Sequence, residues 1–170
     1  SNVTFVARPC LRRMVRGAMG HGAVAGFAGT AAMTTGYAIE RRLRKTVRGP
    51  LDYDDSRVPA DSAARVLDWP RPGPRASRVL GFAVHWGYGS LVGVGAVPLV
   101  RRTGPVPATG AYWGAITAVA ALLFPTLGRT PPPWRWRRDV MVTSLGQHLV
   151  YTAVVVAVLR RIGTGDDQPG

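Results

Sequence analysis

The stretch from Val79 to Val100 holds no charged residue across 22 positions. As a helix it would be about 33 Å long, enough to cross the roughly 30 Å hydrocarbon core of a bilayer. Three more uncharged runs of about 20 residues occur in the chain, and the arginines and lysines lie between and around them. Globular nucleic-acid binders with a similarly basic pI instead alternate basic and apolar residues along amphipathic elements. The segregation predicts an all-α integral membrane protein, a four-helix bundle.

The apolar runs and the charge clusters set the expected boundaries. A membrane domain is expected over 17–162, after a basic arm at 1–16 and before a disordered tail at 163–170. A polar connection, 40–78, separates the first two spans and contains ten basic and six acidic residues. The predicted spans are about 17–39, 79–100, 107–127 and 140–159.

Small residues recur at four-residue spacing along three of the spans. Lipid provides little hydrophobic drive for helix association, so close backbone packing through small residues takes its place. The first span, dominated by Gly, Ala, Thr and Met, is expected to be an interior helix. The surplus of such faces also predicts a homo-oligomer or a larger membrane complex. The candidate packing positions are Gly22, Gly26, Gly29, Gly81, Gly89, Gly93, Gly110 and Gly114.

Ionisable and polar side chains inside the spans are candidate functional groups. The second and fourth spans run in the same direction, which places His85 and His148 roughly 9 to 12 Å from one membrane boundary. Glu40 ends the first span at that same boundary. Helical spacing puts Ser144 and Tyr151 on the face of His148, which should point inward because lipid cannot satisfy these groups. The candidate polar site is His85, His148, Glu40, Ser144 and Tyr151.

Three interpretations of this site stay open at the level of the sequence. In the first, each histidine donates a hydrogen bond to a neighbouring helix, with Ser144 and Tyr151 as partners. In the second, Glu40, His85 and His148 line a pathway for protons or a small solute. In the third, His85 and His148 hold a haem or a metal ion, although closely spaced glycine helices leave little room for a porphyrin.

Other chemistry is poorly represented. The chain has one cysteine, Cys10, which excludes an internal disulfide and a thiolate metal cluster. No nucleophile is paired with a base and no glycine loop is placed to cradle phosphate, so we expect no enzymatic activity and no cofactor. Trp134 and Trp136 alternate with arginines, a pattern that beside two spans favours an interfacial aromatic belt over nucleic-acid binding. The acidic run Asp52–Asp55 does not have the spacing of a calcium loop.

A resemblance to a known family begins at Phe124-Pro125-x-x-Gly128-x-Thr130-Pro131-Pro132 and continues through His148-Leu149-Val150-Tyr151 to Arg160-Arg161. On these residues, and on a histidine early in the second span, the chain resembles the YagU family of small bacterial inner-membrane proteins over about Val79 to Arg161. The family pattern has a carboxylate where this chain has Ser144 and a histidine where it has Ala120. A proton or metal site that used those two groups would be incomplete here.

The charge distribution and the resemblance point to opposite orientations. Fourteen Lys and Arg residues lie on the side of the polar connection and eight on the side of the termini, which by the positive-inside rule puts the connection in the cytoplasm. Many of the fourteen are far from a span end, whereas the short flanks on the other side are close to the membrane. The resemblance implies cytoplasmic termini, and we favour that orientation.

These observations predict a small multi-pass protein of the bacterial inner membrane without catalytic chemistry. Its expected role is that of a structural or partner subunit supporting envelope physiology, with the lipid bilayer and other membrane chains as partners. The alternative is a proton-coupled or small-solute channel or transporter that uses Glu40, His85 and His148.

Overall fold

The computed structural model describes residues 7–43, 64–68, 74–126 and 131–166, and every regular element in these ranges is helical. The all-α prediction is therefore confirmed. The described elements are α1 (Ala7–Leu43), α3 (Pro74–Arg102), α4 (Pro105–Thr126), the short 3₁₀ helix η2 (Pro133–Arg135) and α5 (Arg138–Asp166).

Three of the long helices have the length and composition of membrane spans. The apolar segments are Val79–Arg102 in α3, Pro105–Leu123 in α4 and Arg138–Gly163 in α5. In the described part of the chain, α1 does not reach the hydropathy of the other three long helices. Three helices, and not the four expected, therefore have the length and hydropathy of membrane spans. The reason is composition: Gly, Ala and Thr dominate 17–39, and they contribute little apolar surface per residue.

The helices run past the expected boundaries. α1 begins at Ala7, inside the segment expected to be a basic arm, and α5 continues to Asp166, inside the segment expected to be a disordered tail. A bilayer limits the apolar run and not the helix, and arginine is itself a good helix former. Within the polar connection, residues 64–66 form one helical turn, which ends at Asp68 with a left-handed φ of 48°. The capping residues expected for that turn, and Asp52–Asp55, lie outside the described residues.

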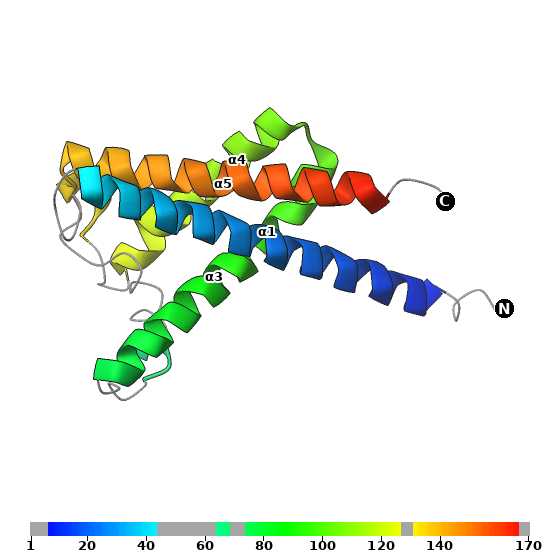
Figure 1. The fold of residues 1–170 in the computed structure, drawn as a ribbon, viewed down its shortest axis with the longest axis horizontal. Helices are drawn as coiled ribbons and strands as arrows, with labels where there is room; N and C mark the ends of the chain where they lie inside the picture. The colour runs from blue at the N-terminus through cyan, green and yellow to red at the C-terminus, as the bar shows by residue number, and fades with distance from the viewer. Residues whose placement is uncertain (1–6, 44–63, 69–73, 127–130, 167–170) are drawn as a thin grey trace.

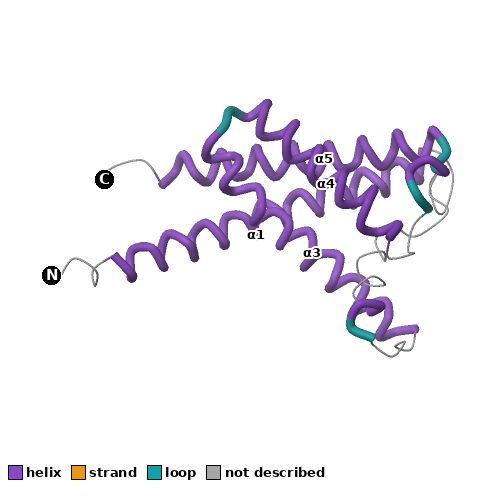
Figure 2. The backbone as a smooth tube through the Cα atoms, turned by 180° about the vertical axis from the view of Figure 1, so that it is seen from behind, coloured by secondary structure: helices purple, strands orange, loops and turns teal. Residues whose placement is uncertain are grey.

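α1 and α5 lie side by side and antiparallel (Figure 1). Glu40, near the end of α1, contacts Thr143 near the start of α5, whereas Gly29 lies against Tyr151 and Val155 further along α5. The N-terminal end of α1 and the C-terminal end of α5 are consequently at the same end of the molecule, as Figure 2 also shows from behind.

α3 crosses α1 obliquely, and its Pro74 end projects away from α1 and α5 (Figure 1). At the crossing the two backbones are in direct contact. A Cβ atom added to Gly93 would lie 2.5 Å from the Cα of Gly26, and one added to Gly22 would lie 2.5 Å from the Cα of Val94. Only hydrogen at these positions permits so close an approach.

The buried core lies where the remaining helices meet this pair. Tyr112 of α4 and Tyr151, Val155 and Val156 of α5 are almost fully buried, together with small residues such as Ala25 of α1. The outward faces of α3, α4 and α5 are apolar, and the exposed large side chains include Phe82, Leu91, Leu122 and Val142. α4 is the least buried of the three apolar helices.

Candidate polar site between the helices

Two tyrosine hydroxyls connect the core to the backbone of α3. Tyr151 donates a hydrogen bond to the carbonyl oxygen of Gly89 at 2.6 Å, and Tyr112 donates to that of Val92 at 2.7 Å. The two rings lie 6.2 Å apart between their centroids. A buried tyrosine contributes a large apolar ring and needs one partner for its hydroxyl, and here both partners belong to another helix.

A third polar group joins α4 to α5. The indole nitrogen of Trp113 donates to the carbonyl oxygen of Leu145 at 3.0 Å. Tyr112 and Trp113 are consecutive, so their side chains leave α4 about 100° apart and reach α3 and α5 respectively. Hydrogen bonds thereby connect one turn of α4 to both α3 and α5.

At the other end of the α1–α5 contact, polar groups face one another in two adjacent layers. Thr143 donates to a carboxylate oxygen of Glu40 at 2.5 Å. One helical turn away, Gln147 lies directly against Gly36, where an added Cβ would be 3.0 Å from Nε2 and would overlap Oε1. Oε1 of Gln147 is buried and has no hydrogen-bond partner among the residues that the structure describes.

His148 uses one ring nitrogen within its own helix. Its Nδ1 lies 2.8 Å from the carbonyl oxygen of Ser144, which can only accept, so Nδ1 is the donor in this bond. The hydroxyl of Ser144 is further away, at 3.5 Å from Nδ1. Among the described residues, Ser144 is thus bonded to His148 along α5 and not across to another helix.

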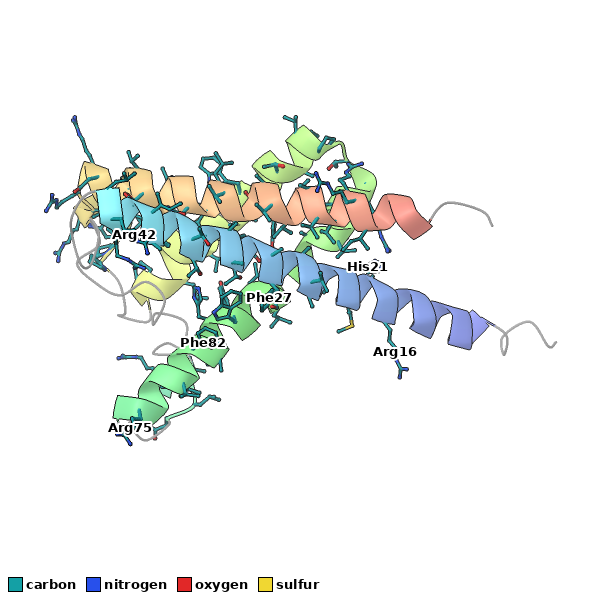
Figure 3. The ribbon with its side chains drawn as sticks, viewed as in Figure 1. Arg16, His21, Phe27, Arg42, Arg75 and Phe82 are labelled. Atoms are coloured by element: carbon teal, nitrogen blue, oxygen red, sulfur yellow. The ribbon has the colours of Figure 1, made fainter. Side chains whose placement is uncertain are left out.

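That His85 and His148 share one site with Glu40 stays a prediction. In the described ranges, no three His, Cys, Asp or Glu side chains come close enough to hold a metal ion. His85 and His148 do lie on the same side of the Tyr151–Gly89 hydrogen bond, one turn and almost one turn before these residues. His21 is about 28 Å from Glu40 along α1, in the half that leads to Arg16 (Figure 3).

The predicted packing glycines divide into two groups. Gly22, Gly26, Gly89 and Gly93 lie at the α1–α3 crossing, and Gly29 lies against Tyr151 and Val155 of α5. The other three, Gly81, Gly110 and Gly114, have no atom of another residue within 4 Å of the position a Cβ would take. These three do not take part in a close helix contact within the described structure.

Thr143, Gln147, Tyr112 and Trp113 make contacts that the sequence did not single out. The first two are four residues apart on α5, and Gly36 and Glu40 are four residues apart on α1. In an antiparallel helix pair, residues four apart on one helix can face residues four apart on the other. This matched spacing is the sequence pattern that could have predicted the contacts. For Tyr112 and Trp113 the signal was two polar-tipped aromatic rings inside an otherwise apolar run.

No family model matches the chain, and no curated protein or solved structure is significantly similar to it.

Proposed function

We propose that this chain is a small multi-pass protein of the bacterial inner membrane, a four-helix bundle that acts as a structural or partner subunit supporting envelope physiology. One observation carries the proposal. Four polar side chains of the apolar helices bond to neighbouring helices: Tyr112 and Tyr151 to α3, Trp113 to α5 and Thr143 to α1. Polar residues used in this way stabilise a bundle, whereas those of a channel or pump face a water-filled path.

α1 is proposed as the fourth span. It is uncharged from Gly17 to Ile39 and lies against both α3 and α5, so much of its surface is covered by protein. A helix that faces its neighbours needs less apolar surface than one that faces lipid. Arg16 and Arg42 lie beyond the two ends of this uncharged stretch, as snorkelling residues would (Figure 3).

The cellular setting rests on the resemblance to the YagU family, which implies the bacterial inner membrane and cytoplasmic termini. The exposed Trp134, 81% accessible, stands between the ends of two apolar helices and beside Arg135 and Arg137. An aromatic ring among arginines at this level is typical of the boundary between lipid and water.

The structural role is tested by ion flux. The purified full-length chain, reconstituted into liposomes with an internal pH-sensitive dye, is expected to dissipate a pH gradient no faster than liposomes without protein. His85→Ala and His148→Ala should leave that rate unchanged. Proton flux in the wild type that both substitutions abolish would establish the alternative, a proton-coupled channel or transporter.

The bonding role is tested by stability. Tyr151→Phe keeps the ring and removes the donor to Gly89, so the free energy of unfolding in bicelles should fall by about 1 kcal/mol. Thr109→Val is the control, because the hydroxyl of Thr109 bonds, within the described structure, the Pro105 carbonyl of its own helix. Equal effects of the two substitutions would contradict a specific interhelical role for Tyr151.

A further inference from the structure

Five arginines gather at the end of the molecule where α1 stops and α5 starts. The hydrogen bond between Thr143 and Glu40 places the last turn of α1 beside the first turns of α5. Figure 3 shows Arg42 at this end, next to the start of α5, whereas Arg75 lies at the projecting end of α3. The five are Arg41 and Arg42 of α1, Arg135 of η2, Arg137 just before α5 and Arg138 at its first residue.

Positive charge is in excess at this end. Glu40 and Asp139 supply the two carboxylates of the described residues here. Asp139 accepts two hydrogen bonds from Arg137, at 3.0 and 3.2 Å. Even when each carboxylate neutralises one arginine, three of the five positive charges remain, whichever partner Glu40 has. An anion is the kind of partner that this surface fits.

The arginines beside η2 are presented by an ordered turn. The indole nitrogen of Trp136 donates to the carbonyl oxygen of Pro131 at 2.7 Å, and two backbone hydrogen bonds close η2. Arg135 and Arg138, near the two ends of this turn, are both exposed. A turn that is ordered before binding loses little entropy when a ligand arrives, which favours binding at this place.

The face of α5 that carries Arg138 continues as an exposed apolar surface. Val142 and Leu149 follow on that face, about 6 and 16 Å further along the helix axis, and both are exposed. Between them, Gly146 has no atom of another residue within 4 Å of the position a Cβ would take. A cation followed by an apolar surface matches the order of headgroup and acyl chain in a phospholipid.

We propose that an anionic phospholipid, phosphatidylglycerol, binds here, with its phosphate among the arginines and an acyl chain along Val142 and Leu149. This binding rests on the proposed function, which places the chain in a membrane. Guanidinium groups donate charge-assisted, bidentate hydrogen bonds to a phosphate, and the exposed Trp134 suits the headgroup level. A zwitterionic lipid carries its own cation, which the excess positive charge repels, so the surface selects a headgroup with a net negative charge.

The test is the affinity for single lipids, measured by native mass spectrometry of the delipidated full-length chain in detergent. Phosphatidylglycerol should bind the wild type at least about fivefold more tightly than phosphatidylcholine. Arg138→Gln should weaken phosphatidylglycerol binding about fivefold, the effect of one cation near an anionic headgroup. Arg75→Gln is the matched control, because it also removes an exposed arginine from the first turn of an apolar helix, and it should leave the affinity unchanged.

Arg138→Lys keeps the charge and should retain most of the preference for phosphatidylglycerol. Equal losses in Arg138→Gln and Arg75→Gln would overturn the proposal, because the attraction would then belong to the overall charge of the chain. Equal affinities of the wild type for the two lipids would also overturn it.

A second measurement separates the lipid from a free anion. In phosphatidylcholine nanodiscs, added phosphatidylglycerol should raise the thermal unfolding midpoint of the wild type, and inorganic phosphate at the same ionic strength should not. An equal rise with inorganic phosphate would assign the arginines to a free anion and overturn the lipid site. Failure of the proposed function would instead appear as proton flux, which neither measurement detects.

Discussion

Gly93 is the residue at which α3 comes closest to α1, with the backbone of Gly26 on the other side. Gly95 stands two positions further along the same helix, and nothing lies within 4 Å of the place where its Cβ would be. The two glycines therefore lie two residues apart on the same helix and differ in whether another helix packs against them.

This pair gives a matched test of the crossing. Gly93→Ala forces the two backbones apart, which should lower the free energy of unfolding by about 1–3 kcal/mol. Gly95→Ala should leave it unchanged or raise it by up to about 1 kcal/mol, because alanine favours the helix. The measurement is reversible unfolding in bicelles, and similar losses at both positions would contradict the crossing.

Sequence spacing at the level of residues predicts which side chains share a face, and it predicts no more than that. Gly93 and Gly114 both belong to four-residue glycine series, yet only Gly93 meets another helix. The difference is set by where the neighbouring helices run, which no local pattern encodes. Gly36 and Glu40 on α1 have the same four-residue spacing as Thr143 and Gln147 on α5. This match predicts a contact only once α1 and α5 are known to be antiparallel.

At the scale of the helices, uncharged length predicted α3, α4 and α5 well, because the thickness of a bilayer sets that length directly. α1 and α5 extend beyond the expected spans, since charged residues stop an apolar run without stopping a helix. The depth argument placed Glu40, His85 and His148 near one membrane boundary, and it stays a prediction, because helix length gives depth and not whether side chains on different helices meet.

The membrane placement of α1 is tested by the accessibility of Val24, whose side chain is 58% exposed midway along the uncharged stretch. In a Cys10→Ser background, Val24→Cys should resist a membrane-impermeant maleimide in intact vesicles. Arg65→Cys and Arg101→Cys should react from opposite sides of the membrane, and the reactive side of each gives the orientation. Rapid labelling of Val24→Cys would show that α1 lies outside the bilayer.

On the scale of the whole molecule, the outward face of α4 differs from the other exposed faces. Between Gly110 and Ala118 it presents small residues, namely Gly110, Ala111, Gly114, Ala115 and Ala118, although Leu122 and Leu123 further along α4 expose large apolar side chains, as α3 and α5 do. Small residues allow close helix packing and cover little lipid. If the expected homo-oligomer forms, this is the face on which the second copy should lie.

The oligomer is tested by cross-linking in native membranes. In the Cys10→Ser background, Ala115→Cys should form an intermolecular disulfide on mild oxidation. Val142→Cys, 68% exposed on α5, is the control for random collision. Cross-linking at Ala115 that is no faster than at Val142 would contradict a dimer through α4.

α5 contacts each of the other three long helices, through Thr143 on α1, Tyr151 on α3 and Leu145 on α4, and Arg160 donates to the carbonyl oxygen of Thr103 between α3 and α4. It is also the last of the described helices in chain order. The α1–α3 crossing requires only residues made earlier, whereas α4 lacks its main neighbour until α5 is complete. Among the described helices, α5 therefore completes the assembly, and a nascent chain that ends before Arg138 leaves the indole of Trp113 without the Leu145 carbonyl as its acceptor.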